Sequence, residues 1–247
     1  MTIEEEIEKC KKDNCKKFEI FWQEFESLAR SISDLKELES LLLFNNMNFT
    51  TLPESIGNLE HLKRLHLTSN NLQKIPKSIG KLKKLEILNV GSNNLCELPK
   101  SISNLKNLEQ VTLRDNKLRK LPKSFKNLKK ITYLDISENK MNVIPEIVCS
   151  LENIVHLKST KNDITKLPKC FDNLKNLKFL FLNDNPVVEK YKNSDTLCNV
   201  FQNNEAISPY LIYNDNLTKD ETMLVKMCVN QKICDPLEAY CETKDLQ

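Results

Sequence analysis

Residues 85–107 read LEILNVGSNNLCELPKSISNLKN, and the same frame of apolar, Asn and Pro positions returns every 23 residues. The frame is L-x-x-L-x-L-x-x-N-x-L-x-x-L-P-x-x-I-x-x-L. Its first position recurs at Leu62, Leu85, Leu108, Ile131, Ile154 and Leu177. A period of this length predicts a chain built from similar units that stack on one another.

The two sides of a predicted strand differ within the unit that begins at Leu85. Leu88 and Val90 are two residues apart, so as strand residues they point to one side, while Ile87 and Asn89 point to the other. The returning half of the unit adds further interior residues: Leu95, Leu98, Ile102 and Leu105. Because each apolar layer is covered only by its neighbours, the core needs several stacked units.

This Leu and Asn spacing is the signature of a leucine-rich repeat, in which every unit adds one strand and one turn. We therefore predict an α/β leucine-rich repeat solenoid, a horseshoe with a parallel concave sheet and a helical cap at each end. Residues 32–188 form the predicted array, with seven strands. Residues 1–31 form the N-terminal helical cap, and residues 189–247 form a C-terminal cap or a helical appendage.

Two columns of residues are interpreted as structural, because every layer carries them. An Asn stands where each strand turns into the interior, and its amide can satisfy the buried backbone groups of that turn. The Asn column is Asn46, Asn70, Asn93, Asn116, Asn139, Asn162 and Asn185. A Pro fixes φ at the start of each return segment. The Pro column is Pro53, Pro76, Pro99, Pro122, Pro145 and Pro168.

The LPxxIxxLxxLxxLxLxxNxL frame resembles the cytosolic 23-residue class of leucine-rich repeat proteins. This class includes the Ras-pathway scaffolds, the Ras-suppressor proteins and the plant intracellular Ras-group proteins. The resemblance covers about residues 32–188 and implies the fold. By analogy it also implies a small GTPase or a phosphatase subunit as partner, although the matching residues are scaffold positions.

From its sequence we expect the protein to be cytoplasmic, neither secreted nor membrane-spanning. The N-terminus MTIEEEIEKCKKD is charged where a signal peptide would be apolar, and no apolar run approaches the roughly 18 residues of a membrane span. The nine cysteines are an odd number without a C-x-x-C pair. Cys96 lies beside an interior Leu, and Cys149 and Cys170 lie on return segments, so we expect reduced thiols.

Charge is distributed unevenly. Residues 1–30 hold 6 Lys and Arg against 8 Asp and Glu, residues 31–185 hold 25 against 16, and residues 186–247 hold 6 against 10. Most lysines of the array fall on return segments and turns, whereas the predicted strands mix both signs. A phosphate-binding groove would concentrate one sign and add stacking aromatic residues, so we expect no nucleic-acid partner.

The N-terminal cap is expected to be helical. Thr2 and Glu5 form a capping box, and an apolar face at helical spacing follows. The face consists of Phe18, Phe21, Trp22, Phe25 and Leu28 or Ala29. The pattern lapses at residues 13–15, which allows two helical segments. We interpret this face as a cover for the first repeat, with a partner-binding helix as the alternative.

After Asn185 the frame ends. A short helix around residues 195–202, an extended piece at residues 207–213 and a helix from Thr218 are predicted, the last with Glu221 in a second capping box. We interpret this region as a cap, and a small appendage that binds a partner remains an alternative.

The candidate site is the set of outward strand positions on the concave face, which parallel pairing turns into adjacent columns. We expect these residues to contact a protein partner: Arg64, His66, Ile87, Asn89, Gln110, Arg114, Tyr133, Asp135, His156, Lys158, Phe179 and Phe181. Phe44 is a further candidate. Aromatic residues and Arg dominate binding energy at protein interfaces, which favours a protein partner.

An enzyme is not expected. His66 and His156 are four strands apart, the cysteines lack metal-ligand spacing, and phosphate-loop, nucleophile-elbow and zinc-helix motifs are absent. We predict no cofactor and no metal. The predicted function is that of a monomeric, non-catalytic protein-interaction scaffold in intracellular signalling. The alternative is a secreted or surface recognition protein that binds a host or extracellular ligand, and disulfides in the native protein would favour it.

Overall fold

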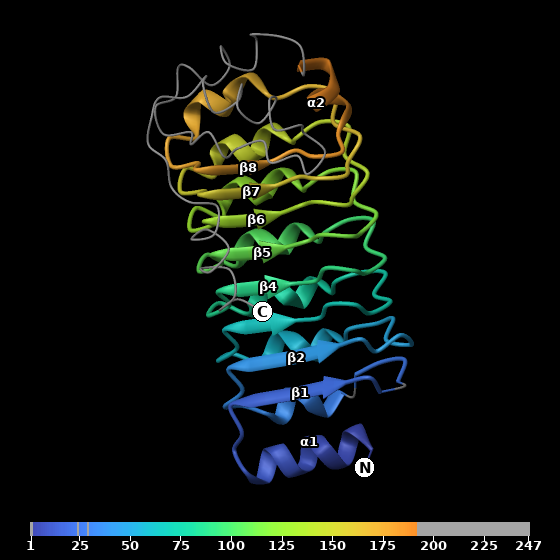
Figure 1. Cartoon of the computed structure of the whole chain (residues 1–247). Coiled ribbons are helices and arrows are strands. Elements are labelled where there is room, and N and C mark those ends of the chain that lie inside the picture. The colour runs from blue at the N-terminus through green and yellow to red at the C-terminus, as the bar shows by residue number, and fades with distance from the viewer. Residues whose placement is uncertain (1, 24, 29, 192–247) are drawn as a thin grey trace, which may run out of the picture.

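The computed structural model describes residues 2–23, 25–28 and 30–191. Within these ranges eight strands form one sheet in chain order, and all neighbouring pairs are parallel. Figure 1 shows the strands stacked along one side of the molecule, with a short helix behind most of them. The predicted solenoid with a parallel sheet is confirmed.

The strands are β1 (Lys17–Phe21), β2 (Ser40–Phe44), β3 (Arg64–His66), β4 (Ile87–Asn89), β5 (Gln110–Thr112), β6 (Tyr133–Asp135), β7 (His156–Lys158) and β8 (Phe179–Phe181). The 3₁₀-helices are η1 (Arg30–Asp34), η2 (Glu54–Asn58), η3 (Lys77–Lys81), η4 (Lys100–Asn104), η5 (Lys123–Asn127), η6 (Glu146–Ser150) and η7 (Lys169–Asn173). The α-helices are α1 (Ile3–Lys12) and α2 (Pro186–Tyr191).

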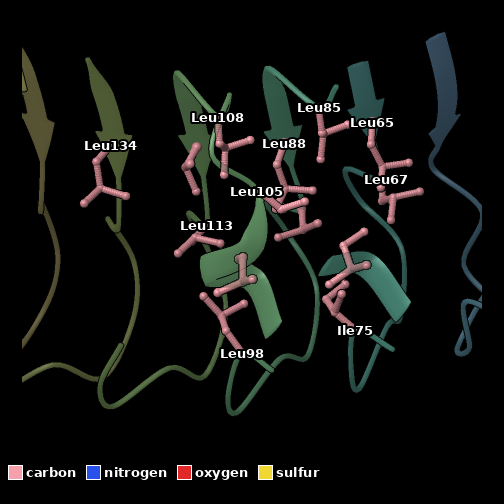
Figure 2. Packing of buried hydrophobic residues seen from close by; sticks show 14 of the residues in the cluster. Leu65, Leu67, Ile75, Leu85, Leu88, Leu98, Leu105, Leu108, Leu113 and Leu134 are labelled. Carbon is pink, nitrogen blue, oxygen red and sulfur yellow. The ribbon is translucent and has the colours of Figure 1, made fainter. Parts of the chain in front are cut away.

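The core is a column of in-register apolar layers. Leu65 pairs with Leu88, Leu88 with Val111, and Val111 with Leu134. These four side chains are at most 1% exposed, and Figure 2 shows the labelled leucines of successive strands extending into one interior. Each such side chain contributes roughly 1.5–3 kcal/mol of burial free energy, and it obtains that burial from the adjacent layers.

Each return segment that begins with a Pro of the frame forms a short 3₁₀-helix. Each Pro of the frame stands at the N-cap of a 3₁₀-helix with φ between −70° and −60°, which is the value that the pyrrolidine ring imposes. Gly57 and Gly80 let these helices approach one another. A Cβ on Gly57 would lie 2.5 Å from the Ser78 carbonyl oxygen, and one on Gly80 would lie 2.5 Å from the Ser101 carbonyl oxygen.

The Asn column behaves as predicted. Asn116 accepts a hydrogen bond from the Leu95 N–H at 2.9 Å and donates from Nδ2 to the carbonyls of Val90 and Leu113 at 3.0 and 3.1 Å. The other members make equivalent bonds across the layers, and all seven are at most 9% exposed. Each amide therefore connects two layers while it satisfies buried backbone groups of the turn.

The N-terminal segment differs from the prediction. The capping box is confirmed, because Glu5 N–H donates to Thr2 Oγ1 and Thr2 N–H donates to Glu5 Oε2, and α1 follows it. However, the helix expected from Phe18 onward is wrong, since residues 17–21 form β1. Phe18 and Ile20 are buried in strand alternation, and pairing with β2 satisfies an edge that would otherwise be open. The sheet thus has one strand before the predicted seven.

Helix α1 lies across the N-terminal end of the solenoid (Figure 1). Ile3, Ile7 and Cys10 form its buried face. At the other end α2 begins directly after Asn185, and the Val187 N–H donates to the Ile164 carbonyl at 2.8 Å. The elements predicted at residues 195–202, 207–213 and from Thr218 lie outside the described residues.

The expectation of reduced thiols is wrong for four cysteines. Disulfides join Cys10 to Cys15 and Cys149 to Cys170, with Cα–Cα distances of 5.1 and 5.8 Å. Sequence spacing did not reveal the second pair, because stacking brings positions 21 residues apart on η6 and η7 face to face. Cys96 is a free, exposed thiol.

Candidate binding surface on the sheet

Strand register aligns the predicted site residues in two columns on the sheet face that points away from the core. The first column is Arg64, Ile87, Gln110, Tyr133, His156 and Phe179, and the second is His66, Asn89, Thr112, Asp135, Lys158 and Phe181. Arg114 lies two residues beyond Thr112. Side-chain contacts divide these residues into one group at each end of the sheet.

The aromatic–lysine cluster comprises Tyr133, His156, Lys158, Phe179 and Phe181, which come from β6, β7 and β8. The His156 and Phe179 rings stack with centroids 4.4 Å apart, and the Tyr133 centroid lies 6.0 Å from His156. Lys158 Nζ lies 5.4 Å from the ring centroids of both Tyr133 and Phe181. Each such cation–π contact contributes about 0.5–1 kcal/mol at an exposed site. The cluster is thus a set of neighbouring rings with one cation between the Tyr133 and Phe181 rings.

A buried carboxyl lies beside this cluster. Asp135 is 5% exposed, and it accepts a hydrogen bond from the Ser137 N–H at 2.9 Å. Burial raises the pKa of Asp135 above its usual value, whereas the Ser137 hydrogen bond and the charges of Lys158 and Arg114 oppose that rise. Burial and the neighbouring Asp135 charge together raise the pKa of Tyr133, so Tyr133 stays a neutral phenol at physiological pH.

Arg114 is already engaged within the chain. Its Nη2 and Nε lie 2.6 and 2.9 Å from Glu138 Oε1, and both side chains reach solvent. An exposed ion pair of this kind contributes about 0–1 kcal/mol. The Arg114 guanidinium is therefore paired with Glu138 beside the cluster, and it takes no part in the ring contacts.

The second group of candidates lies at the other end of the sheet. Arg64 Nε donates to Ser40 Oγ at 3.5 Å, and His66 packs edge-on against Phe44 with centroids 5.9 Å apart. Burial and the Arg64 charge lower the pKa of His66. Phe44 in turn stacks on Phe21 at 5.4 Å. Phe21 was missing from the candidates because it was assigned to a helix, although its alternation with Phe18 and Ile20 was the available signal.

Strands β4 and β5 separate these two ends. Ile87, Asn89 and Gln110 are partly buried there. The Asn89 Oδ1 accepts a hydrogen bond from the Gly91 N–H at 3.0 Å. In the part of the chain that the structure describes, no ring or cation–π contact involves these two strands.

The lysines of the return segments include a structural set that the sequence did not reveal. Lys83 Nζ donates to the Asn104 carbonyl at 3.4 Å, Lys106 Nζ to the Asn127 carbonyl at 3.3 Å, and Lys129 Nζ to the Ser150 carbonyl at 2.8 Å. Each ammonium contacts the C-terminal residue of the next 3₁₀-helix, where unpaired carbonyls favour a cation. Part of the array's positive charge thus connects layers.

Asp135→Asn is expected to raise the free energy of unfolding at pH 7. Asn89 makes the same side-chain bond to the backbone two layers earlier, so the amide fits. Because the folded pKa of Asp135 lies above its usual value of 3.8, the native protein loses stability as pH rises from about 4 through the folded pKa. Denaturant unfolding at several pH values measures the difference.

The stability gain of Asp135→Asn should largely disappear near pH 3.5, where the Asp135 carboxyl of the unmutated protein is mostly protonated in both the folded and the unfolded state. The exposed Asp163→Asn, at a position without a positive φ, is the matched control, and it should leave the free energy of unfolding unchanged at both pH values. A variant Asp135→Asn that is less stable than the native protein at pH 7 would contradict this account.

In the ranges that the structure covers, no three His, Cys, Asp or Glu side chains are grouped so that they could hold a metal ion. The helices in the same ranges include none that is long and apolar enough to span a bilayer.

Comparison with known proteins supports the repeat assignment. Residues 23–117 match the family described as "Leucine-rich repeat region", and residues 106–164 match the family described as "Leucine rich repeat". The chain is a leucine-rich repeat protein. No curated protein matches it.

Solved structures similar to this leucine-rich repeat protein come from varied settings. A leucine-rich repeat protein of Leptospira interrogans is 31% identical with a TM-score of 0.58, over 73% of this chain and 51% of the other, so the chain spans about half of its length. Internalin C2 of Listeria monocytogenes is 21% identical with a TM-score of 0.69, over 83% of both chains.

A third similar structure is the ectodomain of the plant membrane receptor kinase GASSHO1/SCHENGEN3 of Arabidopsis thaliana, in complex with Casparian strip integrity factor 2. It is 24% identical with a TM-score of 0.62, over 87% of this leucine-rich repeat protein and 26% of the receptor. At these identities, the internalin and the receptor show a shared fold alone.

Proposed function

We propose that this leucine-rich repeat protein is a non-catalytic scaffold that binds a protein partner through the aromatic–lysine cluster. The observation that carries the proposal is the row of ring contacts from Tyr133 through His156 to Phe179, with the Lys158 ammonium between the Tyr133 and Phe181 rings on the same side of the sheet. Leucine-rich repeat proteins generally mediate protein–protein interaction.

The physical basis of binding is preorganisation. The rings stand on the paired parallel strands β6, β7 and β8; His156 already contacts Tyr133 and Phe179, and Phe181 contacts the Lys158 ammonium. Ordering of these side chains therefore costs little on association, where each immobilised flexible side chain would otherwise cost about 0.5–1.5 kcal/mol. The Lys158 ammonium favours a partner that places a carboxylate or another hydrogen-bond acceptor beside it.

The cellular setting is proposed in two forms. The resemblance of the repeat frame to Ras-group proteins supports a monomeric scaffold in the cytoplasm, with a small GTPase or a phosphatase subunit as partner. The two disulfides favour the second form, a secreted or surface recognition protein, because such bonds persist in oxidising compartments. Alkylation of the native protein before and after reduction distinguishes the two, since only the secreted form retains four blocked thiols among Cys10, Cys15, Cys149 and Cys170.

The binding experiment compares the intact chain with the triple variant Tyr133→Ala, Phe179→Ala and Phe181→Ala in an affinity pull-down, followed by measurement of Kd for each recovered protein. A partner of the cluster should lose at least a hundredfold in affinity, because aromatic hot spots contribute about 2 kcal/mol or more each. Gln110→Ala with Thr112→Ala, on the strand between the two groups, is the matched control and should bind normally.

Circular dichroism checks that the triple variant folds, and Lys158→Glu provides a second route because it leaves all rings in place. Lys158→Glu should weaken the same partner at least tenfold. If every recovered partner binds the intact chain, the triple variant and Lys158→Glu with one Kd, the cluster is not the binding surface.

A further inference from the structure

Three large apolar side chains in the described part of the chain are exposed, and all belong to the first two layers. Phe21 is 42% exposed, Trp22 is 72% exposed and Met47 is 76% exposed. Phe21 stacks on Phe44 with ring centroids 5.4 Å apart and planes within 13°. We name Phe21, Trp22, Phe44 and Met47 the Trp22 patch.

The Trp22 patch lies at the C-terminal ends of β1 and β2, where Figure 1 shows both arrowheads on the same side. Strand register places Phe21 beside Phe44. The next residues are also joined, because Trp22 N–H donates to the Phe44 carbonyl at 3.3 Å and Gln23 N–H donates to Asn46 Oδ1 at 3.0 Å. Two neighbouring turns therefore hold the patch together.

Trp22 occupies a backbone position that suits other residues better. Its φ is 56°, in the left-handed region that β-carbons disfavour. The equivalent residue after each later strand has φ between 50° and 57° and a polar side chain: Asn45, Ser69, Ser92, Asp115, Glu138, Lys161 and Asp184. Trp22 gains little burial in return for this strain. Strained residues of this kind are typical of functional sites.

The surroundings of the Trp22 patch are acidic on one side. The first turn of α1 carries Glu4, Glu5 and Glu6, whereas its basic residues stand in the last turn. Gln23 Nε2 donates to Glu6 Oε1 at 3.0 Å, which fixes the acidic turn beside the residue that follows Trp22. Figure 1 likewise shows the N-terminus of α1 below the end of β1 where the patch lies.

We propose that the Trp22 patch is a second docking surface, which accepts a protein segment that presents an apolar side chain flanked by Lys or Arg. The exposed rings and Met47 supply the apolar contact, and the Glu4–Glu6 turn supplies the complementary charge. An anionic membrane would be repelled by these carboxylates. A second copy of the chain packed patch to patch would bring two acidic turns together.

Trp22 provides the assay, because it is the single Trp of the chain. The probe is a short synthetic peptide of alternating Leu and Lys, and the matched peptide has Glu in place of every Lys. Titration of the full chain with the Lys peptide should give a saturable blue shift of Trp emission. The Glu peptide should bind at least tenfold more weakly. Equal binding of the two peptides, or no shift with either, overturns the proposal.

Three variants keep the Trp22 reporter and test the surface. Met47→Ala and Phe21→Ser should each weaken the Lys peptide about tenfold, as expected when an interface anchor is truncated. Glu4→Lys should weaken the Lys peptide and strengthen the Glu peptide. The exposed Glu97→Lys on a distant layer is the control and should change neither affinity. Loss of binding in Glu97→Lys equal to that in Glu4→Lys would show non-specific attraction and overturn the proposal.

Trp22→Asn separates a binding role from a structural one. Binding of a fluorescently labelled Lys peptide should be at least tenfold weaker, whereas the denaturation midpoint should rise because Asn45 holds the same conformation in the next layer. A lower midpoint with unchanged binding would mean that Trp22 serves the fold. Emission that shifts with protein concentration alone, or with phosphatidylserine vesicles alone, would instead identify a second copy or a membrane as the occupant.

Discussion

Asn116→Leu is expected to cost roughly 4 kcal/mol or more of unfolding free energy, because each buried group it leaves unpaired costs about 1–3 kcal/mol. The amide accepts from the Leu95 N–H and donates to the carbonyls of Val90 and Leu113. No Leu atom can replace these bonds, and the residue is 7% exposed, so water reaches them poorly. Since small domains have only about 5–15 kcal/mol of stability in total, denaturant unfolding or loss of soluble expression should show the effect.

Asn107→Leu is the matched control for this prediction. Asn107 Nδ2 donates to the Lys83 carbonyl at 2.8 Å, and that bond lies at the solvent-exposed side of the repeat. Water can replace it, so the cost should be below about 1 kcal/mol. Equal losses for Asn107→Leu and Asn116→Leu would mean that the inner column is not the element that supports the turns.

Gly80→Ala is expected to destabilise the protein by about 3 kcal/mol, the upper part of the range for overpacked sites. Its added Cβ would lie 2.5 Å from the Ser101 carbonyl oxygen and 2.9 Å from the Ser101 Cβ. The carbonyl belongs to η4, so the contact is relieved only if two layers move apart. The free energy of unfolding in urea measures the effect.

The control for Gly80→Ala is the same change at Gly91, where the nearest atom to an added Cβ lies 3.3 Å away. Gly91 has no positive φ, and replacing Gly by Ala at a compatible site stabilises by about 0.4–1 kcal/mol. Gly91→Ala should therefore destabilise the protein much less than Gly80→Ala, because its contacts are relieved by shifts of a few tenths of an ångström. A Gly80→Ala protein as stable as Gly91→Ala would show that η3 and η4 are not in close contact.

The repeat positions could be predicted from sequence because the same interaction recurs in every layer. Leu65, Leu88 and Val111 share one interior, and the Asn column makes the predicted backbone bonds, since periodicity alone defines both. The register of the sheet follows, and with it the columns that hold the candidate site. The interior Leu positions and the Asn column recur in the sequence because every stacked layer needs them.

Features that occur once could not be derived in this way. Residues 18–21 match a helical period and a strand period equally, and the open edge of β2 decides for the strand. The Cys149–Cys170 bond depends on the stacking distance between two return segments. Contacts within the candidate site depend on side-chain directions, so the ring contacts of His156 with Tyr133 and Phe179 could not be derived from the repeat frame. The use of either surface by a partner stays a prediction.

The turns after the strands have a consequence for engineering this protein. Eight of them place a residue other than Gly in the left-handed region, from Trp22 to Asp184. Asn or Gly fits this backbone conformation better, so replacing Ser69, Ser92 or Lys161 by Asn or Gly should raise the free energy of unfolding slightly at that turn. Such changes leave the leucine layers intact, so thermal tolerance could be increased one turn at a time without redesigning the interior.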